Sequence, residues 1–304
     1  MKRTLLFLLG VSFLSWAAFA AQEEHFSSAD DAIKALRKAA DAKDTNALAT
    51  IFGPALSGLI SADPVQASNG LARFSRRMSE KVSRVKESDS KVELDIGLEA
   101  WPFPIPLVKD GAEWFFDTAA GQEEILNRRV GNNELDTIRV CSAYVDAQRQ
   151  FAQTDRDGDG VVEYAQRLRS TPGQHDGLYW HAEPGEDESP FGPLIAGARG
   201  EGYRHESKIM ADAQNPYHGY FFKVLTRQGK HAPGGRYNYV INGHMVAGFA
   251  LVAWPAEWGN SGVMTFIVNQ SGKVYEANLG PKTVSIALKM SEYDPDSRWK
   301  LTGQ

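Results

Sequence analysis

The stretch Val92-Glu-Leu-Asp-Ile96 alternates apolar and acidic residues, which is typical of a strand with one buried face. Leu107-Val-Lys109 and Trp114-Phe-Phe116 flank the turn-forming pair Asp110-Gly111, and together they predict a hairpin. Between these strands, Trp101-Pro-Phe-Pro-Ile-Pro106 holds three prolines that donate no backbone hydrogen bonds, so we expect it not to form a central strand. This part of the chain therefore predicts an antiparallel sheet.

Helical patterns precede this sheet. Ser28 followed by Asp31 is similar to a capping box, which marks the start of a helix. Another helix is expected after Asp63-Pro64, because apolar residues recur there at spacings of three and four. These residues are Leu71, Phe74, Met78, Val82 and Val85. Residues 24–120 therefore predict an α+β unit, with helices first and an antiparallel sheet after them.

A second α+β unit is predicted over residues 121–304. A long helical pattern runs from Gln122 to Ala152, and we expect Gly131 to break or kink it. A loop-rich region, Thr154 to Tyr217, is followed by a predicted meander of antiparallel strands, in which Asn242-Gly243 is a strong hairpin turn. Strands and helices do not alternate along the chain, so a parallel sheet and a dinucleotide-binding fold are not expected.

The N-terminus has the three parts of a secretory signal. Lys2 and Arg3 are basic, Leu5 to Phe13 is an apolar run, and Ala18-Phe-Ala20 offers small residues where a signal peptidase cleaves. A membrane anchor is the alternative, but the run is about as short as a spanning helix can be. We expect residues 1–20 to be a signal peptide and the protein to be periplasmic or extracellular. No later stretch has the ~20 apolar residues of a membrane span.

Composition narrows the class of protein further. The chain has 304 residues, of which 42% are hydrophobic and 23% are charged, as in ordinary globular proteins. A net charge of −5 argues against a nucleic-acid partner, because such proteins present a basic face. Cys141 is the single cysteine, which excludes an intrachain disulfide. It falls on the apolar stripe of the long helix, and we expect it to be buried.

Motifs of the well-known enzyme classes are missing from the sequence. It contains no G-x-S-x-G elbow, H-E-x-x-H zinc helix, phosphate-binding loop or C-x-x-C pair. The 7 histidines are dispersed and have no metal-ligand spacing. The catalytic residues are therefore unknown, and the sequence leaves open whether the protein is an enzyme.

One local motif points to a metal ion. In Asp155-Arg-Asp-Gly-Asp-Gly160, carboxylates occupy every second position and glycine the sixth, as in the first half of a calcium loop. Glu163 stands at the ninth position, but the twelfth is Gln166, where a calcium loop has a bidentate glutamate. The candidate metal ligands are Asp155, Asp157, Asp159 and Glu163, with calcium as the candidate cofactor. An acidic surface turn without a metal is the alternative.

Several stretches together resemble a known family. They are Ala100-Trp-Pro-Phe-Pro-Ile-Pro-Leu-Val-Lys109, Trp114 to Gly121, Tyr144-Val-Asp-Ala-Gln148, His231-Ala-Pro-Gly-Gly235 and Gly248 to Glu257. The chain is similar to bacterial exported proteins of the domain-of-unknown-function family 2950 over nearly its whole length after the signal peptide. This resemblance implies export but supplies no catalytic residues.

Two further resemblances concern the fold. Residues 24–120 resemble the cone-shaped fold of nuclear-transport-factor-2-like proteins, which implies a pocket able to hold a small ligand. Residues 121–304 resemble the globular part of type IV pilin-like proteins, in which a long helix precedes an antiparallel sheet. The chain lacks the hydrophobic helix that leads directly into that domain in pilins, so the resemblance implies the fold and not assembly into a pilus.

We therefore expect a non-enzymatic binding or scaffolding protein of the cell envelope, with an envelope protein or a small ligand as its partner. The alternative is a hydrolase or another ligand-processing enzyme that uses a pocket in the N-terminal unit. Such an enzyme needs an acid and a base that converge in the pocket. Glu93, Asp95 and Asp117 are the carboxylates available, but the alternation of the strand places Glu93 and Asp95 opposite its apolar face.

Overall fold

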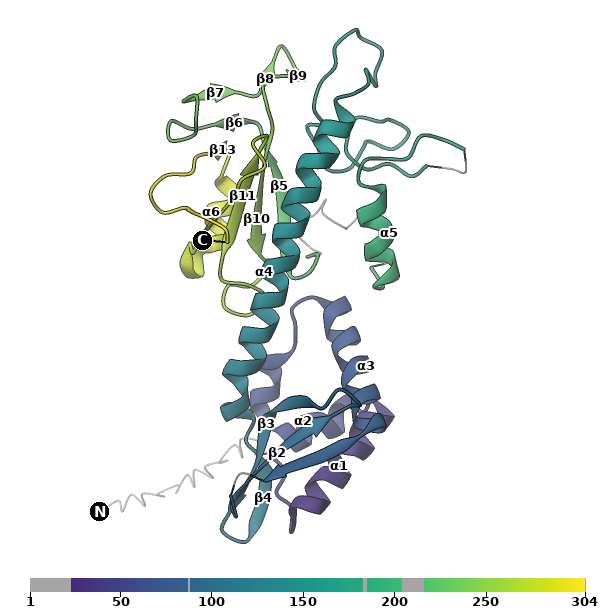
Figure 1. Ribbon diagram of the computed structural model, residues 1–304, viewed down its shortest axis with the longest axis vertical. Helices are drawn as coiled ribbons and strands as arrows, with labels where there is room; N and C mark the ends of the chain where they lie inside the picture. Colours follow the sequence, from purple (N-terminus) through teal and green to yellow (C-terminus); the bar gives the residue numbers. More distant parts are fainter. Residues whose placement is uncertain (1–22, 87, 183–184, 204–215, 304) are drawn as a thin grey trace, which may run out of the picture.

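The computed structural model describes residues 23–86, 88–182, 185–203 and 216–303, and the expected signal peptide lies outside them. Figure 1 shows two lobes through which one long helix, α4 (Thr118–Phe151), passes. Helices are followed by an antiparallel sheet in both lobes, which confirms the predicted α+β class. In the described residues, no helix combines the length and hydropathy needed to cross a membrane.

The N-terminal lobe begins with helices that polar side chains cap. They are α1 (Ala29–Ala42), α2 (Thr45–Phe52), the 3₁₀ helix η1 (Pro54–Leu59) and α3 (Pro64–Glu80). Ser28 caps α1, as its sequence predicts, and Asp63 caps α3 by accepting the backbone N–H groups of Val65 and Gln66. The apolar stripe predicted for this helix included residues beyond its end at Glu80. Val82 and Val85 belong to the strand that follows the helix.

Four antiparallel strands complete this lobe in the order β1-β2-β3-β4. They are β1 (Val82–Lys86), β2 (Lys91–Ile96), β3 (Trp101–Asp110) and β4 (Glu113–Phe116). Trp101–Pro106 forms the first part of β3, but only β2 pairs with this stretch, so it is a strand that is not central, as its prolines lead us to expect. Its prolines face away from β2: Pro106 O accepts the N–H of Asp117, and Pro102 O accepts the guanidinium of Arg128. Since β4 pairs only with Leu107–Asp110, no strand needs the missing N–H groups.

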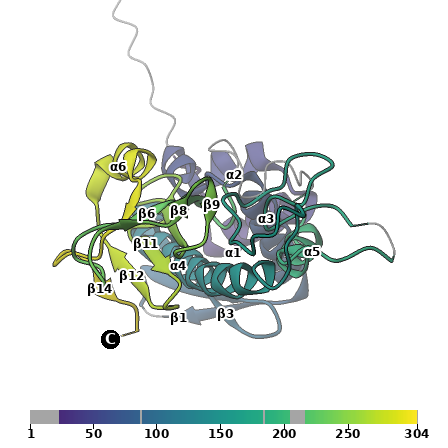
Figure 2. The ribbon, with the colours of Figure 1, turned by 90° about the horizontal axis from the view of Figure 1, so that it is seen from above.

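Helix α4 runs without interruption through Gly131, so the expected break there was wrong. It packs against β3 in the N-terminal lobe and against β10, β11 and β12 in the other. Asp117 caps its start by accepting the N–H of Ala120. From both viewing directions, the C-terminal sheet lies on one side of α4 and helix α5 (Gly192–Gly200) on the other (Figures 1 and 2).

The C-terminal sheet is antiparallel and has the order β14-β12-β11-β10-β5. Its strands are β5 (Tyr220–Leu225), β10 (Ala250–Pro255), β11 (Thr265–Asn269), β12 (Val274–Ala277) and β14 (Lys300–Leu301). Both β10 and β11 are buried throughout, because α4 and helix α6 (Thr283–Lys289) both pack against this sheet. The antiparallel pairing of β10, β11 and β12 in chain order confirms the predicted meander, and α5 falls in the region that the sequence predicts to be loop-rich.

Five short strands in the described part of the C-terminal lobe form small sheets apart from the five-stranded one. They are β6 (Arg227–Gln228), β7 (Tyr237–Asn238), β8 (Val240–Ile241), β9 (His244–Met245) and β13 (Glu292–Tyr293). Asn242 and Gly243 connect β8 to β9 with φ of 52° and 95°, as the predicted two-residue turn requires. Cys141 is buried in the larger hydrophobic core, as expected, and burial raises the pKa of its thiol to about 12, which disfavours the nucleophilic thiolate.

Candidate functional site

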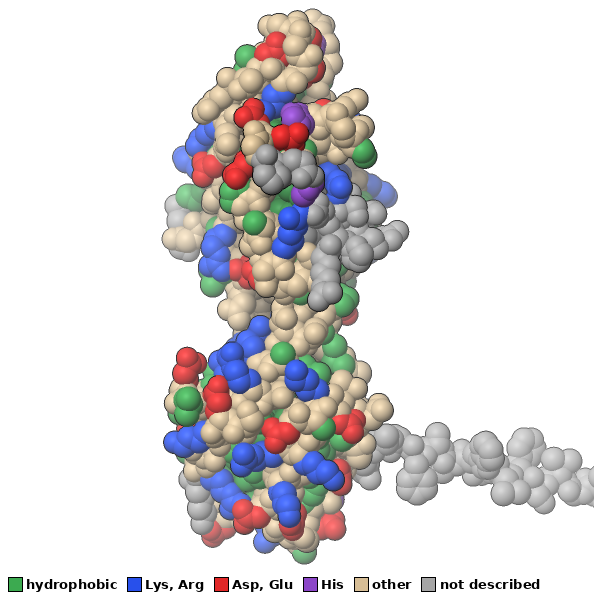
Figure 3. Space-filling view, turned by 90° about the vertical axis from the view of Figure 1, so that its right-hand side faces the viewer, with side chains coloured by type: hydrophobic (Ala, Val, Ile, Leu, Met, Phe, Trp, Pro, Cys, Tyr) green, Lys and Arg blue, Asp and Glu red, His purple; other side chains and the backbone are tan. Residues whose placement is uncertain are grey.

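A cleft of about 1360 Å³ lies where the two lobes meet. Its walls come from α2, η1 and α3 on one side, from β3 and α4 on another, and from Glu201, Tyr203 and His218 of the C-terminal lobe. Figure 3 shows the molecule narrowing between the lobes, with basic and hydrophobic side chains around the narrowing. The resemblance of residues 24–120 to a cone-shaped fold implies a pocket in the N-terminal unit. The cleft includes residues of that unit and extends to the C-terminal lobe.

Apolar side chains form the part of the cleft inside the N-terminal lobe. They are Leu48, Phe52, Leu56, Leu59, Leu71, Phe74, Phe103, Ile105 and Ile125. Two more apolar residues that line the cleft are largely exposed, Ile60 at 54% and Leu135 at 57%. Apolar side chains therefore line the cleft both beside the hydrophobic core and at its exposed side.

His218 marks the polar end of the cleft. Its Nδ1 lies 3.0 Å from Oδ2 of Asp136, and its Nε2 lies 3.1 Å from Oε2 of Glu201. A neutral imidazole has a single N–H, so both contacts are hydrogen bonds only when the ring is a cation. Burial alone would lower the pKa of His218, but the hydrogen bond and charge of Asp136 and the charge of Glu201 raise it above its ordinary value.

Asp63 and Tyr203 connect the lobes behind this histidine. The carboxyl group of Asp63 is buried, and its Oδ2 accepts the hydroxyl of Tyr203 at 2.6 Å and the N–H of Gly219 at 3.3 Å. The other oxygen of Asp63 caps α3. The residue that starts a helix of one lobe therefore also binds two residues of the other.

Side chains of α4 hold the remaining wall of the cleft. Arg129 donates to the backbone carbonyls of Leu59 and Ile60 and to the side chain of Asn260. Asn133 accepts the side-chain amide of Gln66 at 2.6 Å and donates to the backbone carbonyl of Ser261 at 2.8 Å. Both residues therefore bind the two lobes at once and set the width of the cleft.

The carboxylates suggested by the sequence do not line this cleft. Glu93 lies on the sheet beside Lys91, at 3.3 Å from its Nζ, and Asp117 caps α4. Asp136, Glu201 and His218 are not predicted as a group, because they are far apart in the chain. No local pattern joins the three residues, and the positive φ of His218 and Gly219, 48° and 73°, is known only from the structure.

The acidic loop lies at the far end of the C-terminal lobe. One carboxylate oxygen from each of Asp155, Asp157 and Asp159 lies within 4.8 Å of the others, an arrangement that could hold a metal ion. Glu163 is not part of this group: its Oε2 accepts the N–H of Met245 at 2.8 Å, and its Oε1 lies 3.6 Å from Nδ1 of His244, which also lies 3.4 Å from Oδ2 of Asp159. The structure thus groups three of the four predicted ligands.

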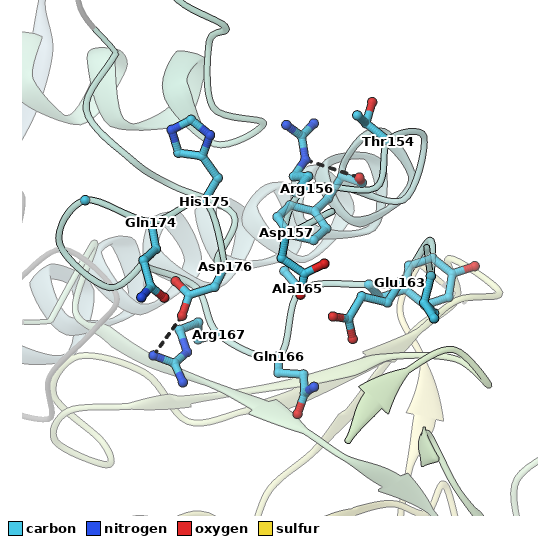
Figure 4. Close-up of a pocket in the computed structure, with 14 residues that line it drawn as sticks. Thr154, Arg156, Asp157, Glu163, Ala165, Gln166, Arg167, Gln174, His175 and Asp176 are labelled. Carbon is cyan, nitrogen blue, oxygen red and sulfur yellow. Dashed lines mark hydrogen bonds and ion pairs between the residues drawn. The ribbon is translucent and has the colours of Figure 1, made fainter. Parts of the chain in front are cut away.

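A second cavity, of about 550 Å³, adjoins this loop. Figure 4 shows that the carboxylates of Asp157 and Glu163 point into it from one side. On the other side, Arg167 forms an ion pair with Asp176 at 3.2 Å, and His175 stacks on Trp180 with ring centroids 4.3 Å apart. Most of its polar groups therefore already have partners within the protein.

The comparisons with known proteins agree with the sequence resemblance. No curated protein and no solved structure matches this chain, so the likenesses to cone-shaped and pilin-like folds stay predictions. A family model, described as "Protein of unknown function (DUF2950)", matches residues 23–302, which is nearly all of the chain. The chain therefore belongs to the DUF2950 family.

Proposed function

We propose that this protein is an exported, non-enzymatic binding module that holds a ligand with a long apolar part in the cleft between its lobes. The observation that carries this proposal is the cleft's volume of about 1360 Å³ together with its apolar walls. Ligand pockets of roughly 300–1,000 Å³ suit drug-sized molecules, so this cleft suits a larger or more extended one. The exposed side chains of Ile60 and Leu135 add apolar surface to the lining of the cleft.

Binding is favoured over hydrolysis by the arrangement at the polar end. A general base needs a free lone pair within reach of the substrate. Both ring nitrogens of His218 are engaged, one by Asp136 and the other by Glu201. The hydroxyl of Tyr203 is bound to Asp63. Among the described residues that line the cleft, no nucleophile is paired with an available base.

The test is to fill the cleft. Gly70 lies in α3 on the cleft wall, and a Cβ added there would meet no atom within 4 Å, so Gly70→Phe places a ring in the open space. Gly131→Phe is the matched control, because Gly131 also lies in a helix, has the same free space and does not line the cleft. Titration with dodecanol, an uncharged twelve-carbon probe, should show binding to wild type and Gly131→Phe and a loss of at least tenfold in Gly70→Phe. Equal binding to all three proteins, or to none, would contradict the proposal.

Export is part of the same proposal and is supported by the basic, apolar and small-residue segments of residues 1–20. N-terminal sequencing of the protein from its native host should begin at Ala21. Met1 at the start of protein from a cytoplasmic fraction would contradict export.

We also propose that the loop of Asp155, Asp157 and Asp159 binds calcium weakly. The closeness of the three carboxylates supports this, since oxygen ligands suit that ion. Glu163 is the fourth candidate ligand, and it would reach the ion through a water, as residues at the ninth loop position often do. With only part of the ligand set of a calcium loop present, we expect a Kd of about 10⁻⁴–10⁻³ M, the range of extracellular modules.

A further inference from the structure

Building on the proposed binding function, we propose that the ligand of the cleft is an amphiphile with one anionic head group. Its apolar chain lies among the residues inside the N-terminal lobe, and its head lies against Arg73. The shared chemistry is a carboxylate or phosphate on a long hydrocarbon chain.

The charges that line the cleft favour an anion. The basic side chains are Arg73, Arg129, Arg139 and His218, and the acidic ones are Asp136 and Glu201. Basic groups therefore predominate in the cleft, whereas the whole chain carries a net charge of −5. Because an apolar wall lowers the local dielectric, this excess acts more strongly on a bound ion than it would in water.

The acidic residues are already satisfied by neighbouring cations. Asp136 forms an ion pair with Arg139 through Oδ1 and binds His218 through Oδ2. Glu201 also contacts His218, and its side chain is 45% exposed, so solvent screens it. A cationic ligand would have to displace these built-in partners, whereas an anionic ligand can use Arg73, for which no ion pair with a described residue is found.

Arg73 is the cation best placed to receive the head group. It lies on α3 beside Phe74, which belongs to the apolar wall, and it has no ion-pair partner among the described residues. It follows Asn69 by four residues, slightly more than one helical turn, or about 6 Å along the axis. The side chain of Asn69 donates to the backbone carbonyl of Glu201 at 2.8 Å, which places this face of α3 next to the His218 end of the cleft.

Arg129 is also cationic, but its guanidinium is occupied by the carbonyl groups of Leu59 and Ile60. We therefore assign it to holding the lobes together and not to the head group. Of these two arginines in the cleft, we therefore expect Arg73 to determine the preference for an anionic head group.

The experiment compares probes with one chain length and different heads: dodecanol, dodecanoate, dodecyl phosphate and dodecyltrimethylammonium, each titrated below its micelle concentration at pH 7. Wild type should bind the better of the two anions at least tenfold more tightly than dodecanol, and the cation most weakly. Whichever of dodecanoate and dodecyl phosphate binds more tightly identifies the head group within the anionic class. Raising the salt concentration should reduce the preference.

The variants are Arg73→Gln and its matched control Arg76→Gln. Arg76 lies on the same helix, is exposed and pairs with Glu80 at 3.5 Å, but it does not line the cleft. Arg73→Gln should weaken anion binding by about fivefold or more and leave dodecanol unchanged, whereas Arg76→Gln should change neither. Equal affinity for all heads, tighter binding of the cation, or equal effects of the two variants would overturn this inference while leaving the apolar binding function intact. Failure of every probe to bind would overturn both.

Discussion

The Nδ1 atom of His218 lies 3.0 Å from Oδ2 of Asp136, so a residue just before β5 is bonded to the middle of α4. His218 adopts a φ of 48°, which costs a residue with a side chain some strain, and the bond to Asp136 helps to hold it there. Glu201 at the end of α5 contacts the opposite nitrogen. One ring therefore joins three segments that are far apart in the chain.

This arrangement predicts how stability depends on pH. The raised pKa of His218 means that its contribution is complete below its ordinary pKa of ~6.5 and is lost as pH rises through the folded value. Burial favours the neutral form of Asp136, but the hydrogen bond and charge of His218, together with Arg139, lower its pKa. Its contribution is therefore present above ~3.9 and is lost as pH falls through the folded value.

We expect the melting temperature of wild type to fall as pH rises from 6 to 9. His218→Asn, chosen because asparagine tolerates positive φ, should cost about 1–3 kcal/mol at pH 6 and much less at pH 9. Thermal denaturation at several pH values measures both. An undiminished cost of the variant at pH 9 would show that the ring is not held as a cation.

Tyr203→Phe removes the hydroxyl that Asp63 accepts at 2.6 Å. Because Asp63 is buried, the loss leaves part of its hydrogen-bonding capacity unmet, and we expect a cost of about 1–3 kcal/mol in the free energy of unfolding. Tyr217→Phe is the matched control: its ring packs 5.1 Å from that of Tyr203, and its hydroxyl has no hydrogen bond to a described residue. Denaturant unfolding of the two variants should therefore differ clearly, and equal costs would mean that the Asp63 contact contributes little.

Two glycines of α4 should respond in opposite ways to alanine. A Cβ on Gly121 would lie 2.8 Å from Cγ1 of Ile105 and 2.8 Å from the carbonyl oxygen of Pro104, so Gly121→Ala should destabilise the protein by about 1–3 kcal/mol. A Cβ on Gly131 would meet nothing within 4 Å, so Gly131→Ala should stabilise it by about 0.5–1 kcal/mol through helix propensity. Urea denaturation checks both. Stabilisation by Gly121→Ala would mean that α4 does not pack closely on β3.

The sequence predicted the fold class and most strands because local patterns encode them, as the alternation of Val92 to Ile96 shows. Prediction of the α3–β1 boundary was wrong for a physical reason. Val82 and Val85 continue the spacing of three and four, and no glycine or proline ends the helix before them. The prolines of Trp101–Pro106 do not prevent a strand, because only β2 pairs with this stretch, and how far β4 extends is not contained in a local pattern.

The cleft could not be predicted in the same way. Its polar end joins Asp136, Glu201 and His218, and each of these residues alone is an ordinary surface or loop residue. Their convergence follows from packing of both lobes along α4, which is tertiary information. The acidic loop is the opposite case, because Asp155, Asp157 and Asp159 are neighbours in the chain and their spacing alone predicts that they cluster.

The acidic loop offers the last test. Asp157 is the residue to change, because Asp155 accepts the N–H groups of Gly158 and Gly160 and so forms the turn itself. An ion bound to the folded state alone stabilises it by about 2.7 kcal/mol at a hundredfold excess over Kd, which corresponds to a few degrees in melting temperature.

Wild type should therefore melt a few degrees higher in a large excess of calcium than in chelator, and Asp157→Asn should lose this difference. In chelator, the variant should be at least as stable as wild type, because one of three mutually repelling carboxylates is gone. Asp41→Asn, which removes an exposed carboxylate at the end of α1, controls for the change in net charge and should keep the full calcium response. A melting temperature of wild type that is the same in calcium and in chelator would assign these residues to an acidic turn without a metal.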